Sequence, residues 1–160
     1  MKKSALFVIC GITLVVIASN MSYEQQTIIP ALKHWLQNKP LEGWLSQFEI
    51  HYWGKVISVE SRGYFYFIEF LVRKATHFFG YGLLAVLFYL FYKKLHWRFS
   101  SLLALLTIII IASLDEYRQS VIPGRTGIID DVYIDACGAL TLLIIVKVLT
   151  GLRNLWTQKG

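Results

Sequence analysis

The chain has 160 residues, of which 56% are hydrophobic, and its mean hydropathy is +0.52. This length is that of a single domain, and this apolarity excludes an ordinary soluble protein, so the composition predicts an integral membrane protein. The formal net charge of +6 would suit a nucleic-acid-binding protein, but the placement of the charges along the chain argues against that class.

The first predicted spanning helix covers residues 4–19. Lys2 and Lys3 precede it, and at 1.5 Å per residue it reaches about 24 Å, a little short of a hydrocarbon core of about 30 Å. A basic start, an apolar run and small residues at Ala18 and Ser19 also fit a secretory signal peptide. We favour an uncleaved helix, because no good small-x-small cleavage site ends the run and further apolar segments follow it.

Residues 20–74 form a long connection that is rich in tryptophan and tyrosine and contains helix breakers at Pro30, Pro40 and Gly43. Aromatic side chains with one polar end prefer the boundary between membrane and water. Short helices lying on the bilayer surface are therefore one interpretation. Packing of the connection over the helix bundle is the other, and the sequence does not decide between them.

Three further apolar segments, residues 75–92, 99–114 and 132–150, have the length and apolarity of helices that satisfy their own backbone hydrogen bonds in lipid. The predicted fold is an all-α integral membrane protein with four transmembrane helices and a long, extracytoplasmic, aromatic-rich connection between the first and the second. Cys10 and Cys137 lie singly in apolar runs, where thiols usually behave as small buried hydrophobes. We therefore expect neither a disulfide nor a cysteine-ligated metal.

The basic residues predict an orientation in the membrane. With the N-terminus inside, the chain start, the connection from Lys93 to Arg98 and the region from Lys147 onward hold eight Lys and Arg residues and no acid. The other side holds eight Lys and Arg residues and all ten acids. Short cytoplasmic loops carry such a basic excess, so we expect both termini in the cytoplasm. The positive charge is then a topology signal, and we expect no nucleic-acid partner.

Residues 114–138, between the third and fourth apolar segments, concentrate ionisable side chains. Each such group costs about 2.5–3.5 kcal/mol at the bilayer centre, so a group that is kept near the membrane indicates a functional site. The predicted topology brings this stretch to the same membrane face as residues 73–81. The side chains that we expect to form a site there are Lys74, His77, Tyr81, Asp115, Glu116, Gln119, Arg125, Asp131 and Asp135.

Simpler roles compete for several of these acids and their neighbours. Asp130 is expected to cap the fourth helix, whereas for Asp131 a cap and a functional role are equal alternatives. Asp135 could serve hydrogen bonding between helices. Asp115 and Glu116 lie near the C-terminus of the third helix, where negative charge is disfavoured, so they need compensation. The available cations are Arg73, Lys74, Arg118 and Arg125.

Four motifs follow one another over residues 73–150. They are K-x-x-H-F (Lys74, His77, Phe78) with Tyr81 after it, D-E-x-x-Q (Asp115, Glu116, Gln119), P-G-R (Pro123, Gly124, Arg125) and D-x-x-x-[N/D]-x-x-G (Asp131, Asp135, Gly138). In this order they resemble the VanZ-like family of membrane proteins, although the family often has Asn at the position of Asp135 and an acid at that of Arg73. The resemblance implies one VanZ-like membrane domain over residues 1–160, with residues 73–150 as its motif core.

The resemblance also implies a small protein of the bacterial cytoplasmic membrane, in a family whose namesake is associated with resistance to teicoplanin. We expect its partners to be the lipid bilayer and a lipid-linked cell-wall precursor, an anionic head group or a glycopeptide. Lys74 and Arg125 would bind phosphate, because an ammonium and a planar guanidinium both suit that group.

A membrane enzyme acting on a lipid-linked or cell-wall substrate is the alternative, and the sequence leaves open whether the chain is an enzyme. His77 with Asp115, Glu116 or Asp131 could supply general acid–base chemistry, and carboxylates with the histidine could hold a divalent ion. No H-E-x-x-H, G-x-S-x-G or P-loop motif occurs, so neither a reaction class nor a cofactor is indicated. The third interpretation is a purely structural network of ion pairs that joins the helices.

Overall fold

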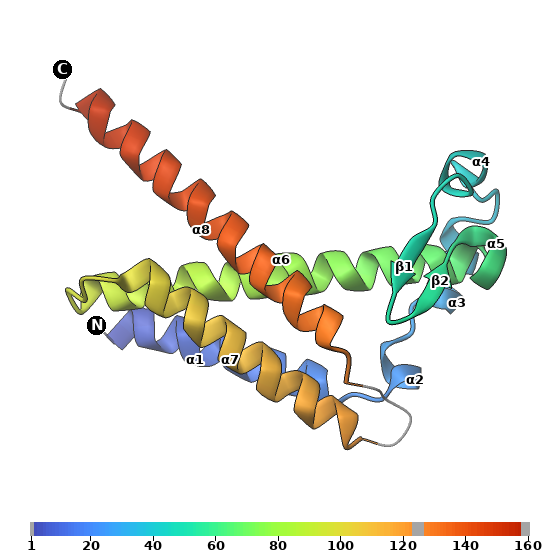
Figure 1. Ribbon diagram of the computed structural model, residues 1–160, viewed down its shortest axis with the longest axis horizontal. Coiled ribbons are helices and arrows are strands. Elements are labelled where there is room, and N and C mark those ends of the chain that lie inside the picture. The colour runs from blue at the N-terminus through green and yellow to red at the C-terminus, as the bar shows by residue number, and fades with distance from the viewer. Residues whose placement is uncertain (1, 123–126, 158–160) are drawn as a thin grey trace.

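The computed structural model describes residues 2–122 and 127–157, and these residues are mainly helical (Figure 1). Four long helices dominate it: α1 (Lys2–Asn20), α6 (Tyr64–Lys94), α7 (Ser100–Ser120) and α8 (Ile129–Thr157). All four are long and apolar enough to cross a membrane. The prediction of four spanning helices is confirmed to this extent.

The helices extend beyond the apolar segments that predict them. α6 has 31 residues and begins at Tyr64, whereas the apolar pattern predicts a start at residue 75. At 1.5 Å per residue α6 is about 46 Å long, against a hydrocarbon core of about 30 Å. α7 likewise continues to Ser120, and α8 already begins at Ile129. Apolarity marks the part of a helix that suits lipid, while the helical hydrogen bonds continue into sequence that is polar or aromatic.

Two connections lie at the same end of the bundle. Figure 1 shows the segment between α1 and α6 at the end where α7 passes into α8, with the N-terminus at the opposite end. The connection between α1 and α6 contains α2 (Tyr23–Gln26), α3 (Ile29–Trp35), α4 (Glu42–Leu45), β1 (Ile50–Tyr52), β2 (Lys55–Ile57) and α5 (Val59–Arg62). We term this end the hairpin end, after the β1–β2 hairpin.

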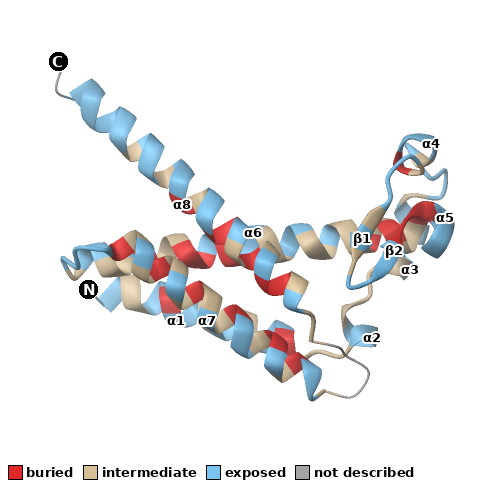
Figure 2. Ribbon diagram, in the orientation of Figure 1, coloured by how far each residue is buried: buried red, intermediate tan, exposed pale blue. Residues whose placement is uncertain are grey.

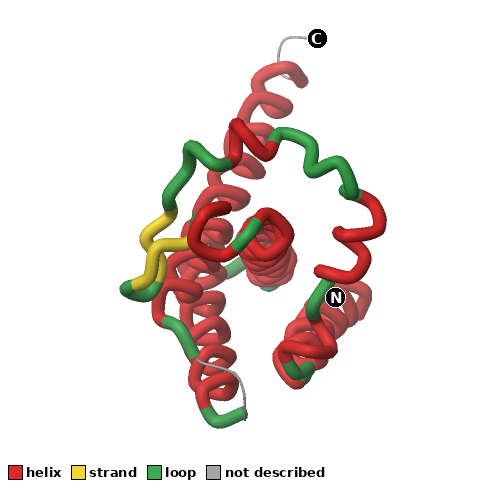
Figure 3. Tube along the Cα trace, turned by 90° about the vertical axis from the view of Figure 1, so that its right-hand side faces the viewer, coloured by secondary structure: helices red, strands yellow, loops and turns green. Residues whose placement is uncertain are grey.

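The connection folds around the projecting start of α6. Figure 3 looks onto the hairpin end and shows the chain passing around the end of that helix. Leu45, Ile57 and Val59 are buried in one cluster with Tyr64 and Phe67 of α6. Of the two interpretations of this aromatic segment, packing over the helices is therefore the one that the structure favours.

The β-hairpin departs from the all-α prediction. β1 and β2 are antiparallel, with Tyr52 opposite Lys55. Between them Trp53 and Gly54 have φ angles of 50° and 68°, and two central residues with positive φ are typical of a type I′ hairpin turn. The sequence signal for this hairpin is the glycine after Trp53, flanked by aromatic and β-branched residues. A search for long apolar helices does not detect it.

The core of the bundle combines alanines with larger apolar and aromatic side chains, and the outer faces of α1 and α8 are largely exposed (Figure 2). Ala85, Ala104, Ala112 and Ala139 each have 0% exposed surface. Small side chains let membrane helices approach closely, while the exposed leucines, isoleucines and valines suit lipid. The described part of the chain thus has the exterior expected of a membrane protein.

Both cysteines lie on the exterior rather than in the core. Cys10 on α1 and Cys137 on α8 are free and exposed. The expectation that they would be buried is wrong, because the apolar runs that contain them belong to outward-facing helix surfaces. A thiol behaves as a small apolar group, so it is as compatible with surrounding lipid as with a protein core.

α6 and α8 pack directly against each other at two glycines. A Cβ atom at Gly138 would overlap the backbone of Phe78, and one at Gly82 would lie 2.8 Å from the backbone oxygen of Gly138. Residues without a side chain therefore permit this helix contact. The contact fixes the register in which the polar residues of α6 and α8 meet.

Candidate functional site

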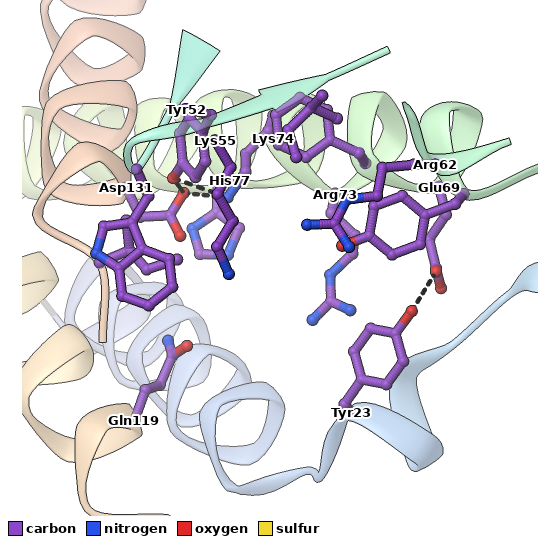
Figure 4. A pocket seen from close by; sticks show the side chains of 15 residues that line it. Tyr23, Tyr52, Lys55, Arg62, Glu69, Arg73, Lys74, His77, Gln119 and Asp131 are labelled. Atoms are coloured by element: carbon purple, nitrogen blue, oxygen red, sulfur yellow. Dashed lines mark hydrogen bonds and ion pairs between the residues drawn. The ribbon is translucent and has the colours of Figure 1, made fainter. Parts of the chain in front are cut away.

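The first contact group of the hairpin end joins α6, α8 and the hairpin. Lys74 on α6 forms an ion pair with Asp131 on α8, with Nζ 2.5 Å from Oδ1. Tyr52 of β1 donates its hydroxyl to the same carboxylate oxygen at 2.5 Å, and the Lys74 ammonium donates to the Tyr52 hydroxyl at 2.9 Å. Figure 4 shows these three side chains together, with His77 beside them. Three distant parts of the sequence thus meet at one carboxylate.

Tyr52 belongs to this contact group although the sequence did not predict it there. Burial, and after it the hydrogen bond with Asp131, raises the pKa of Tyr52. The phenol is therefore neutral at physiological pH and remains a donor. Because the folded-state pKa is raised, this effect stabilises the fold fully below the ordinary tyrosine pKa of about 10 and is lost as the pH rises above it.

The second group pairs His77 with Asp135. The imidazole Nδ1 of His77 lies 3.1 Å from Oδ1 of Asp135, which has 0% exposed surface. The other oxygen of Asp135, Oδ2, has no hydrogen-bond partner among the residues that the structure describes. Asp115, Glu116 or Asp131 was the acid expected to act with His77, but its partner in the structure is Asp135. A carboxylate at one ring nitrogen fixes the orientation of a histidine.

The third group ties the end of α7 to α6 and to the start of α8. Tyr81 donates to Asp115 at 3.0 Å, and Gln119 donates to Asp115 at 2.9 Å and to Glu116 at 3.3 Å. The backbone N–H of Ile128 donates to Glu116 at 2.8 Å. Neutral donors thus surround two acids that the α7 dipole disfavours.

The expected compensation of these two α7 acids by cations is not found among the described residues. Lys74 pairs with Asp131, and Arg73 donates to Gln26 at 2.7 Å. No described cation forms an ion pair with either acid of α7. The P-G-R motif, Pro123 to Arg125, lies outside the described residues, so the role expected for its arginine stays a prediction.

Asp130 links the hairpin to α8. α8 begins at Ile129, so Asp130 lies inside the first turn and does not occupy the cap position that we expected. Its carboxylate accepts a hydrogen bond from the backbone N–H of Trp53 at 2.9 Å. Negative charge in a first turn is favourable in any case, so Asp130 stabilises the helix start while it holds the hairpin turn.

Glu69 is a second residue that the sequence analysis did not assign. It is 1% exposed and accepts hydrogen bonds from the Tyr23 hydroxyl and from the backbone N–H of Ile28, both at 2.9 Å. Burial, and after it this hydrogen bond to Glu69, raises the pKa of Tyr23. In the sequence, Glu69 is a single acid inside a strongly aromatic run. Such an acid is expected to be buried, and a buried carboxylate needs hydrogen-bond donors from elsewhere in the fold.

A cavity of about 310 Å³ opens between the hairpin, α2 and the start of α6, and we term it the polar cavity (Figure 4). Tyrosine, tryptophan and phenylalanine rings line part of it. Its charged lining residues are Lys55, Arg62, Glu69, Arg73, Lys74 and Asp131. Four cations against two carboxylates, with His77 also on the wall, make this a site that favours an anion.

A second cavity of about 590 Å³ lies between α1, α6 and the end of α7, and we term it the apolar cavity. Leu14 and Val15 of α1 and Leu84 and Leu87 of α6 are typical of its walls. Arg73, His77 and Gln119 line both cavities. The two spaces therefore adjoin at these three side chains.

The divalent ion that carboxylates with His77 could hold receives no support from this geometry. Within residues 2–122 and 127–157 no three His, Cys, Asp or Glu side chains are grouped so as to hold a metal ion. The acids are instead divided among the three contact groups.

The chain matches a known protein family over most of its length. The family model described as VanZ/LLP1 matches residues 4–150. The match includes α1 and the connection to α6, so it extends well beyond the motif core at residues 73–150. No curated protein and no solved structure matches the chain.

Proposed function

The chain belongs to the VanZ/LLP1 family, and we propose that its polar cavity binds a lipid-linked precursor, an anionic head group or a glycopeptide. It is a multi-pass membrane protein, as the four spanning helices and the family match indicate. We further propose the bacterial cytoplasmic membrane, with both termini in the cytoplasm and the hairpin end outside. The excess of Lys and Arg at the opposite end supports this orientation.

The charge of the polar cavity is the observation that carries the proposal. Its two acids already have partners, since Asp131 pairs with Lys74 and Glu69 accepts two hydrogen bonds. Lys55 and Arg62 form no ion pair with a described residue and lie over aromatic rings, at 4.9 and 5.6 Å from the ring centroids. Two cations are thus available, and charge-assisted hydrogen bonds to phosphate are among the strongest that proteins make.

Removing these two cations tests the proposal. We expect Lys55→Gln with Arg62→Gln to weaken the binding of inorganic pyrophosphate by about tenfold per removed charge, because a hydrogen bond to a charged group contributes about 1.5 kcal/mol or more. The measurement is calorimetric titration of the protein in phosphatidylcholine nanodiscs, at two salt concentrations. Binding by the wild type should weaken at high salt.

The matched control removes two cations from the same connection but outside the polar cavity. Lys33→Gln with Lys39→Gln changes the net charge equally and should leave pyrophosphate binding within about twofold of the wild type, since neither residue lines the cavity. If both double variants lost pyrophosphate affinity equally, the effect would be one of net charge alone, which would contradict the proposed site. Teicoplanin susceptibility of a host carrying the Lys55 and Arg62 variant then decides whether the site serves resistance.

A specific observation also favours the enzyme alternative. His77 is held by the buried Asp135 and lines the polar cavity, where a general base could activate water for attack on the terminal phosphorus of a lipid pyrophosphate, so that the bond between the two phosphates breaks and the lipid monophosphate leaves. Under this alternative, release of phosphate from a lipid-linked pyrophosphate should fall by about a hundredfold or more in His77→Gln, the contribution typical of acid–base catalysis. Wild-type protein that binds the lipid without turnover would reject it.

A further inference from the structure

We propose that the ligand of the polar cavity is an anionic lipid and that its hydrocarbon chain lies in the apolar cavity between α1 and α6. This inference rests on the proposed function and narrows it, because a soluble anion or a glycopeptide without a chain would leave the apolar cavity unused. The occupant to which it commits is a membrane lipid with a phosphate in its head group.

The junction of the two cavities is the first argument. Arg73, His77 and Gln119 line both spaces. A molecule with a charged end and an apolar end could therefore place one end in each cavity and pass between them at these three side chains. At this junction the lining changes from cations at the hairpin end to leucines and valines along the bundle. This is the order in which a lipid carries its charged head group and its apolar chain.

The depth of the apolar cavity is the second argument. Along α6 its lining runs from Val72 to Leu87, and the part from the junction residue His77 to Leu87 is about 15 Å long at 1.5 Å per residue. A hydrocarbon core is about 30 Å thick, so this depth is that of one leaflet. A lipid of the leaflet at the hairpin end has its head group at the level of the polar cavity and its chain at the level of the apolar one.

The volume of the apolar cavity is the third argument. Protein interiors are close-packed, and an engineered apolar cavity of about 150 Å³ already takes up benzene. The space here is about 590 Å³ and, unlike that enclosed cavity, is partly open to the outside of the bundle. One of its walls is loosely attached, since α1 buries only Val8 and Ser19 among its described residues. In a membrane the apolar material at hand to fill such a space is a lipid chain.

Gly80 offers a way to fill the cavity without disturbing the fold. It lines the apolar cavity, and a Cβ atom there would meet nothing within 4 Å. In Gly80→Leu the new side chain therefore enters space that the lipid chain would need. Gly151→Leu is the matched control, because Gly151 also lies in open space on a spanning helix and lines neither cavity.

The probe is phosphatidic acid with a photoactivatable diazirine in its acyl chain, in nanodiscs of phosphatidylcholine. We expect the wild type to be labelled on α1 and α6 at the apolar cavity. Labelling there should fall about tenfold in Gly80→Leu, which corresponds to the loss of about two buried methylenes, and should be unchanged in Gly151→Leu. Ala18→Leu, from the opposite wall on α1, should repeat the loss.

Different results overturn this inference and the proposed function. Unchanged labelling in both Gly80→Leu and Ala18→Leu, together with pyrophosphate binding that depends on Lys55 and Arg62, would reject the lipid chain and leave the head-group site standing. If pyrophosphate binding and lipid labelling were both unchanged in the variant that lacks the Lys55 and Arg62 charges, the proposed function itself would be rejected. Labelling spread evenly over the outer faces of all four helices would reject a chain site in the apolar cavity.

Discussion

Gly138→Ala is expected to lower the free energy of unfolding by about 3 kcal/mol, at the upper end of the usual range for overpacking. The added Cβ atom would overlap the backbone of Phe78 on α6, and backbone cannot turn aside as a side chain can. The helices must then separate locally, which also draws Asp135 away from His77. Thermal unfolding in detergent, followed by circular dichroism, measures the change.

Gly151→Ala provides the opposite result as a control. Both glycines lie in α8, but a Cβ atom at Gly151 would meet nothing within 4 Å. There the substitution should raise stability by up to about 1 kcal/mol, because alanine is the better helix former. If Gly138→Ala were as benign as Gly151→Ala, the close contact of α6 with α8 would not exist as described.

This glycine contact explains which part of the site could be predicted from the sequence. Residues three or four apart share a helix face, so Lys74 and His77 lie on one face of α6 and Asp131 and Asp135 on one face of α8, and these two faces meet. Spacing does not say which acid meets which base, because that depends on the register of α6 against α8. The register is set by the close contact of the two helices at Gly82 and Gly138. Such a contact depends on both helices at once and cannot be predicted from the spacing within one of them.

The helix ends and the hairpin could not be predicted from apolarity for a related reason. Apolarity reports what surrounds a helix, and the first turns of α6 are surrounded by the connection rather than by lipid. Tyr64 and Phe67 lie in this part and are buried by the short elements that wrap around it. Tyr52, which reaches Asp131, ends β1 directly before the two-residue turn at Trp53 and Gly54. The periodic pattern of any single segment therefore cannot predict the contact between Tyr52 and Asp131.

The Lys74–Asp131 pair can separate a structural network from a binding site. Lys74→Met leaves the carboxylate of Asp131 without its cation, and breaking a buried pair in this way costs about 3–5 kcal/mol. We expect the lower end of that range, because the Lys74 side chain keeps 19% of its surface exposed. Tyr52 still donates to Asp131, which limits the loss further. Chemical or thermal unfolding in detergent micelles measures it.

The double variant Lys74→Met with Asp131→Leu supplies the decisive comparison. Replacing both members of a buried pair by apolar residues is often neutral for stability, so most of the loss in the single variant should be recovered. Pyrophosphate binding should change little in the double variant, because the loss of one cation together with one carboxylate leaves the net charge of the cavity lining unchanged, and Lys55 and Arg62 remain. Recovered stability with retained binding assigns the Lys74–Asp131 pair to the fold. Recovered stability with lost binding would mean that Lys74 itself contacts the anion.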